Sequence, residues 1–80
     1  MEESEELKLS FYPNPASNNL SIELGEEFLG EPFQIYNQQG QLIRNQQISV
    51  LNFNCDLRDL ANGVYFIRIG ELSERLVIER

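Results

Sequence analysis

The side chains able to perform chemistry in this chain are few: there is one cysteine and no histidine, and two pairs of carboxylates beyond the acidic first six residues are the candidates for acid–base chemistry. Without a histidine base, Cys55 cannot belong to a Cys-His nucleophile, and no Ser-His-Asp triad can form. The carboxylate pairs are Asp56 with Asp59 and Glu26 with Glu27. General acid–base catalysis needs a buried carboxylate with a raised pKa, but these four lie in turn-forming stretches, where carboxylates are solvated or cap backbone amides. The sequence therefore predicts no catalytic residue.

A metal or cofactor site is not expected either. Asp56 and Asp59 lack the glycine-spaced series of further oxygen ligands that a Ca²⁺ loop supplies, and a Cys/His zinc site needs histidine. A lone cysteine excludes an intrachain disulfide, so we interpret Cys55 as a small buried hydrophobe beside Phe53. Eighty residues also leave little volume for an internal pocket of about 300 Å³, the lower limit for small-molecule sites.

The charge of the chain is concentrated at its start. Of the formal net charge of −7, four negative charges belong to glutamates within residues 1–6, which leaves −3 for residues 7–80. We expect residues 1–6 to be an acidic leader that is disordered or foreign to the domain. The basic residues form no cluster, so we expect no nucleic-acid partner, and no apolar run approaches the ~20 residues of a membrane span, so we expect no membrane insertion.

Two strands joined by a stiff corner are predicted at the start of the chain. Leu7, Leu9 and Phe11 alternate with polar residues, and the alternation resumes over 19–24. Tyr12-Pro13-Asn14-Pro15 must end the first strand, because proline cannot donate to a ladder. We expect the Asn14 side chain to bond a backbone amide two residues on. Core or turn packing is the expected role of Tyr12, and also of Tyr36.

The middle of the chain predicts a loop and a hairpin. Residues 25–31 are too short for a stable helix, and we expect Phe28 or Leu29 to tuck against the core. A strand over 33–36 enters Asn37-Gln38-Gln39-Gly40 and leaves through Leu42 and Ile43. This is the pattern of a type I turn with Gly40 in the left-handed conformation, followed by a bulge.

The last third predicts a compact turn and the most apolar strand. Asp56 can cap the turn in which Leu57 and Leu60 point underneath, and Gly63 can take a positive φ. The strand over 64–69 has apolar residues on both faces, which is typical of a central strand. A short strand ending near Cys55 and a final strand over 75–79 bring the total to about seven. Such regular spacing without a convincing helix predicts an all-β antiparallel sandwich of two sheets.

Three segments stand in a fixed order: Tyr12-Pro13-Asn14-Pro15 with Leu20-Ser21-Ile22, then Ile35–Leu42 around Gly40, then Leu60-Ala61-Asn62-Gly63-Val64-Tyr65 running on to Ile69. Together they resemble the C-terminal sorting domain, type A, of the Bacteroidetes type IX secretion system, also called the Por secretion system. The resemblance covers about residues 7–80. It implies an immunoglobulin-like seven-stranded sandwich at the end of a larger cargo protein. The residues that match the family motifs are Pro13, Asn14, Pro15, Gly40, Leu60, Gly63 and Tyr65.

The resemblance implies that the domain is a sorting signal and not an enzyme. It directs cargo from the periplasm across the outer membrane to the cell surface or the extracellular medium, through type IX translocation and shuttle proteins, and a sortase-like peptidase commonly removes it. The family tends to end in a lysine-rich strand, whereas this chain ends with acids between its arginines. We hypothesise that the machinery reads the last strand, whose unpaired backbone edge would accept a partner strand. The residues concerned are Arg75, Leu76, Val77, Ile78, Glu79 and Arg80.

The alternative is a fibronectin-like or carbohydrate-binding sandwich appended to a bacterial surface enzyme. Fold arguments cannot separate a binding module from a sorting domain. Position can, because a sorting domain is the last part of its parent protein and is removed, whereas a binding module is retained.

Overall fold

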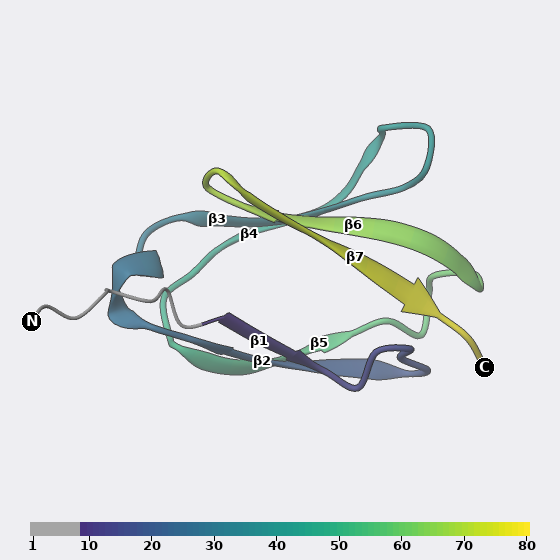
Figure 1. Ribbon diagram of the computed structural model, residues 1–80, viewed down its shortest axis with the longest axis horizontal. Coiled ribbons are helices and arrows are strands. Elements are labelled where there is room, and N and C mark those ends of the chain that lie inside the picture. The colour runs from purple at the N-terminus through teal and green to yellow at the C-terminus, as the bar shows by residue number, and fades with distance from the viewer. Residues whose placement is uncertain (1–8) are drawn as a thin grey trace, which may run out of the picture.

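The computed structural model describes residues 9–80 and arranges them as two facing antiparallel sheets (Figure 1). One sheet has the strand order β1-β2-β5 and the other β4-β3-β6-β7. The elements are β1 (Leu9–Tyr12), β2 (Asn19–Leu24), the 3-10 turn η1 (Glu26–Phe28), β3 (Pro32–Tyr36), β4 (Leu42–Gln47), β5 (Asn52–Asp56), β6 (Gly63–Ile69) and β7 (Leu72–Ile78). The predicted all-β sandwich is confirmed. The predicted acidic leader and Leu7 lie outside the described residues.

The core lies between the sheets, because each strand turns alternate side chains inward. The rings of Phe33 and Phe53 meet edge to face across the gap, with centroids 5.5 Å apart. Cys55 is buried as predicted, and its thiol is free. The largest fully buried side chains are Phe33, Leu20, Ile22, Ile35, Ile48, Leu57, Ile67, Ile69, Leu76 and Ile78. Each contributes roughly 1.5–3 kcal/mol through its burial, which makes this layer the main source of stability.

The strand predicted to be central is central: β6 lies between β3 and β7. Two other strands extend beyond their predicted bounds. β4 continues to Gln47 and β7 begins at Leu72, which leaves only Gly70 and Glu71 as the turn before it. Both strands lie at sheet edges, where polar side chains can point to solvent while the backbone stays paired on one side.

The hairpin between β3 and β4 has the predicted turn. Gly40 has a φ of +83°, its amide donates to the Asn37 carbonyl at 3.0 Å, and the Asn37 amide donates to the Gln41 carbonyl at 3.0 Å. Farther along, the register shifts so that Tyr36 lies opposite Leu42. The shift leaves Ile43 as an extra residue that packs against the core.

The stretch between β2 and β3 forms the single turn η1. Phe28 is buried there, and Leu29 is 49% exposed, so Phe28 is the residue that the core recruits. Within residues 9–80 no helix has the length and apolar character needed to cross a membrane.

Candidate functional site

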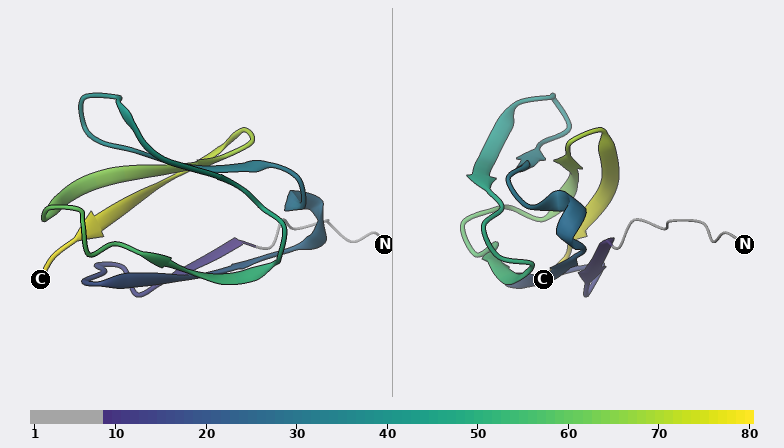
Figure 2. Two further views of the ribbon diagram at one scale, coloured as in Figure 1. Left: turned by 180° about the vertical axis from the view of Figure 1, so that it is seen from behind. Right: turned by 90° about the vertical axis from the view of Figure 1, so that its left-hand side faces the viewer.

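The connections that carry the predicted motifs gather at one end of the sandwich (Figure 1). Residues 13–18, 37–41 and 57–62 lie there with residues 79–80, whereas η1 and the β6–β7 turn lie at the opposite end, and Figure 2 shows the same arrangement from behind. We call the first end the motif pole. The alternation of strand directions places these four segments at the same end of the sandwich, although they are far apart in the sequence.

Asn14 fastens the first motif to the last strand. Its Nδ2 donates to the carbonyl of Arg75 at 3.0 Å, and its Oδ1 accepts from the amide of Val77 at 3.1 Å. The local bond predicted for this side chain, to an amide two residues on, is therefore wrong. The amide group of Asn14 pairs with β7 as the backbone of a neighbouring strand would, because it offers one donor and one acceptor. Pro13 and Pro15, which flank it, both follow cis peptide bonds.

Ala16 continues this attachment along β7. Its amide donates to the carbonyl of Val77, and its carbonyl accepts from the amide of Glu79, both at 2.8 Å. These bonds form an isolated parallel bridge opposite Ile78, and Ala16 itself is fully buried. The connection between β1 and β2 thus closes the side of the sandwich where β1 and β7 are the edge strands.

The unpaired edge predicted for the last strand is therefore wrong over much of its length. The carbonyl of Arg75, both backbone groups of Val77 and the amide of Glu79 are already bonded by Asn14 or Ala16. A partner strand cannot add here without displacing the motif. A role of Arg75–Arg80 in recognition stays a prediction, but it must act through side chains.

The third motif shapes the turn that leads into β6. Oδ1 of Asp56 accepts from the amide of Arg58 at 3.0 Å, and the amide of Leu60 donates to the carbonyl of Leu57 at 2.9 Å, so the predicted cap is present. Gly63 then begins β6 with a φ of +155°.

Tyr65 ties this turn to β6 itself. Its hydroxyl donates to the carbonyl of Ala61 at 2.7 Å, while its ring is buried. A tyrosine near the start of a strand that bonds the backbone a few residues upstream is the tyrosine corner of immunoglobulin-like sandwiches. Leu60, Gly63 and Tyr65 therefore have evident structural roles at the motif pole.

The contacts of Arg80 were not predicted from the sequence. Its guanidinium donates to the Leu60 carbonyl at 2.6 Å, to Oδ1 of Asn18 at 3.1 Å, and also to the Leu57 carbonyl. Its amide donates to Oδ1 of Asn62 at 3.2 Å. The first and third motifs are thus joined through one side chain. A cation just beyond an alternating strand is the only signal in the sequence, and it does not identify the carbonyls that it meets.

Charged side chains beside the motif pole are paired with one another. Arg44 bonds Asp59 at 2.6 Å and the Asp56 carbonyl at 2.7 Å, and Arg58 bonds the Asp56 carboxylate at 2.9 Å. Hydrogen bonds from Arg58 lower the pKa of Asp56 to about 2. These four residues line an open hollow of about 510 Å³. A carboxylate with so low a pKa is a poor proton acceptor, so Asp56 is not suited to general base catalysis.

Cys55 lies behind this cluster. Burial raises the pKa of its thiol, although Arg44 lies 3.7 Å from the sulfur and opposes the shift. A thiol held in its neutral form is a weak nucleophile. Within residues 9–80 no three residues of the metal-binding types lie close enough together to hold an ion.

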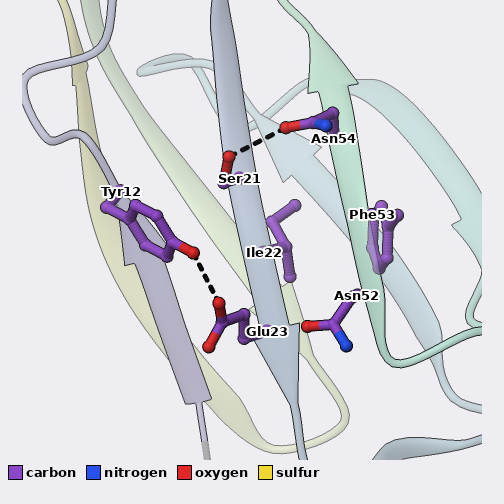
Figure 3. Close-up of a pocket in the computed structure, with 7 residues that line it drawn as sticks. All are labelled: Tyr12, Ser21, Ile22, Glu23, Asn52, Phe53 and Asn54. Carbon is purple, nitrogen blue, oxygen red and sulfur yellow. Dashed lines mark hydrogen bonds between the residues drawn. The ribbon is translucent and has the colours of Figure 1, made fainter.

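Tyr12 and Tyr36 do not form a common platform for a sugar. Tyr12 is 46% exposed on the outer face of the three-stranded sheet, so the packing predicted for it is wrong, and its hydroxyl donates to the Glu23 carboxylate (Figure 3). Tyr36 lies on β3 in the other sheet and bonds Gln34 at 3.1 Å. Tyr12 and Tyr36 therefore cannot form a carbohydrate-binding surface together.

Comparison with known proteins agrees with the motifs. A family model described as the secretion system C-terminal sorting domain matches residues 10–79. The curated protein beta-agarase A of Zobellia galactanivorans is 29% identical over 68 residues, which are 85% of this chain and 13% of that protein. No solved structure matches the chain significantly. The chain belongs to the family of secretion system C-terminal sorting domains, the type IX sorting signals of larger cargo proteins that reach the cell surface or the extracellular space.

Proposed function

We propose that this domain is a folded sorting signal. Type IX translocation and shuttle proteins recognise it in the periplasm, and a sortase-like peptidase removes it after the cargo has crossed the outer membrane. The domain is the part that is recognised and cut. It contributes no catalytic group of its own to either step.

The observation that supports recognition of the folded domain is the set of hydrogen bonds that join the segments of the motif pole. Asn14, Ala16 and Arg80 join the first motif, the third motif and the end of β7 through hydrogen bonds between segments that are far apart in the sequence and meet only in the folded domain. A short linear signal would not need such bonds. This arrangement of the motif residues is therefore available to a partner only in the folded domain.

The direction of the chain supports separate places for cargo and recognition. Leu9 pairs with Leu24 at the η1 end of the sandwich, so a cargo that precedes β1 joins the domain at the end opposite the motif pole. Arg75 and Glu79 are exposed near the motif pole and remain available to a partner through their side chains. Residues 75–80 thus stay the candidates for contact with the machinery, by side chains and not by strand addition.

The test fuses the full chain to the C-terminus of a periplasmic reporter, expressed with a signal peptide in a bacterium that has type IX secretion. The reporter alone should stay in the periplasm, the fusion should reach the medium or cell surface, and a fusion with the domain at the reporter's N-terminus should not. Removal of the domain would lower the mass of the exported product by nearly 9.3 kDa. A C-terminal fusion that stays in the periplasm would refute the sorting function, and an exported product of full mass would refute removal of the domain.

A further inference from the structure

The outer face of the four-stranded sheet carries an unusual set of side chains. The pairing registers place Leu42, Tyr36, Phe66 and Arg75 in one continuous row across β4, β3, β6 and β7. Val64 and Val77 lie opposite each other in a second row, and Gln34, Arg68 and Ser73 occupy a third. All of these side chains point away from the core, because their neighbours along each strand are the inward-facing residues. We call these nine residues the apolar outer face.

Much of this apolar surface is open to solvent. Leu42 is 47% exposed and Phe66 is 38% exposed, and Tyr36 lies between them. The register shift at Ile43 is what turns Leu42 outward, since without it Leu42 would share the inward side with Arg44. A hollow of about 420 Å³ opens between Tyr36, Phe66 and the β3–β4 turn. Exposed apolar side chains grouped in this way mark an interaction surface more often than scattered ones do.

The charge of the apolar outer face is opposite to that of the whole chain. It holds Arg68 and Arg75 and no carboxylate, although the chain has a net charge of −7. The guanidinium of Arg75 has no hydrogen bond or ion pair within residues 9–80, and that of Arg68 makes only a long contact of 3.4 Å to the Gly70 carbonyl. Aromatic and arginine side chains are the types most enriched at protein–protein contacts. Two unengaged arginines beside an apolar row fit a partner that brings carboxylates beside its own apolar residues.

We propose that the apolar outer face is the docking surface for a protein of the secretion machinery, whose matching surface is apolar and acidic. The inference rests on the proposed function and names the surface that the machinery covers. It replaces strand addition along β7, because the backbone there is bonded while Arg75 and Val77 present their side chains on this face.

A protein is favoured over a membrane or a second copy of this chain. Adsorption to anionic lipid gains only about 1 kcal/mol per basic residue, so two arginines in a chain of charge −7 give little net attraction. A symmetric dimer through this face would pair it with its own copy, which supplies no carboxylate to these arginines. An acidic protein surface meets neither obstacle.

The test compares two double variants in the reporter fusion. Leu42→Ser with Phe66→Ser removes the apolar row, and Leu29→Ser with Val50→Ser removes two side chains that are 49% and 54% exposed outside that face. We expect the first pair to lower the exported reporter by at least about tenfold and the second pair to leave it within about twofold. Circular dichroism and urea midpoints verify folding, and Leu42→Ser alone serves if the double variant does not fold. Export of a folded Leu42/Phe66 variant at the wild-type level would overturn the proposal while leaving the sorting function intact.

A second pair of variants isolates the charge. Arg75→Gln on the apolar outer face and Asn52→Asp on the opposite sheet each change the net charge by −1. We expect export to fall several-fold for Arg75→Gln only, and equal effects would overturn the charge argument. Binding of the purified chain to phosphatidylglycerol vesicles, or self-association in sedimentation, would overturn the protein partner if Leu42→Ser with Phe66→Ser abolished it. A wild-type fusion that is not exported would remove the proposed function and this inference with it.

Discussion

The outer faces of the two sheets differ although both are built from alternating strands. The three-stranded sheet turns only polar side chains and Tyr12 outward, in the rows Tyr12–Ser21–Asn54, Ser10–Glu23–Asn52 and Asn19–Asp56. The four-stranded sheet turns Leu42, Tyr36, Phe66 and two valines outward. Among these strand residues, the first face holds two carboxylates, of which Asp56 is paired with Arg58, and the second holds two arginines and no carboxylate. One sandwich therefore has two faces of opposite chemical character.

Side chains of the polar face are hydrogen-bonded to one another, as Figure 3 shows for two pairs. Tyr12 donates to Glu23, and Ser21 donates to Asn54 at 2.8 Å across neighbouring strands. A face of this kind gains little from being covered, because a partner would have to replace water at groups that are already partly paired. The apolar outer face has the opposite balance, since its exposed side chains release water when they are covered. The difference indicates which side of the domain is built to be buried.

The edges of the four-stranded sheet show a related asymmetry. The edge of β7 is sealed by Asn14 and Ala16, whereas β4 relies on the irregularity at Ile43 and on polar side chains such as Asn45. Both devices hinder strand addition, which natural sheets commonly avoid. A partner is therefore directed to the faces of the sandwich, and the following predictions test whether the two faces differ as described.

The largest effect is expected for Asn14→Ala, which removes the seal beside the four-stranded sheet. The variant leaves the Arg75 carbonyl and the Val77 amide without their partner, so the free energy of unfolding should fall by about 1–3 kcal/mol. Asn54→Ala on the polar face is the matched control and should cost no more than about 0.5 kcal/mol. Urea denaturation measures both, and equal losses would show that Asn14 is an ordinary surface amide.

Next in size is Arg80→Ala, compared with Arg75→Ala. The guanidinium of Arg80 donates to two backbone carbonyls and to Asn18, so its loss should cost about 1 kcal/mol, because the group is exposed and water partly replaces the bonds. Arg75 has no such bonds, and its truncation should change stability by less than about 0.5 kcal/mol. If Arg75→Ala were the more destabilising variant, the arginine of the apolar outer face would be structural and not free for a partner.

The sequence predicted what depends on local pattern. The alternation divided Tyr65, Ile67 and Ile69 from Val64, Phe66 and Arg68, as the two faces of β6 do, and Gly40 located the hairpin. It did not predict the partner of Asn14, because the bonded strand lies about sixty residues away and an asparagine beside prolines also fits a local turn. Pairing across sheets is a property of the assembled fold.

The apolar row was hidden from the sequence for the same reason. Leu42 reaches the face of Tyr36 and Phe66 only through the pairing of three strands and the shift at Ile43. A regular hairpin would have placed Leu42 on the same side as Arg44. The row is therefore a consequence of register, which alternation alone does not reveal.

A smaller effect separates Phe66→Ser from Tyr12→Ser. Phe66 lies opposite Tyr36 on the neighbouring strand and is 38% exposed, so its replacement should cost about 0.5–1 kcal/mol in unfolding free energy and should shorten retention on a hydrophobic-interaction column. The ring of Tyr12 is more exposed, but its hydroxyl is bonded to Glu23 and its row neighbours Ser21 and Asn54 are polar. Tyr12→Ser should therefore shorten retention less. A larger change in retention for Tyr12→Ser would mean that the two faces present similar apolar surface, and the contrast between them would fail.

The smallest effect concerns pH and the acidic side of the molecule. Asp56 has a pKa of about 2 in the folded chain, below its ordinary value of 3.8, because Arg58 donates to its carboxylate. A carboxyl group with a lowered folded pKa stabilises the fold above its unfolded pKa and loses that contribution as pH falls toward the folded value. Asp56→Asn keeps the oxygen that accepts from the Arg58 amide but removes the charge. The gap in urea midpoint between wild type and Asp56→Asn should therefore be constant from pH 7 to 5 and close between about pH 4 and 2. Arg75 lies on β7 in the other sheet, so Arg75→Gln should leave the acid limb of the stability profile unchanged, and a shifted limb would couple the two faces.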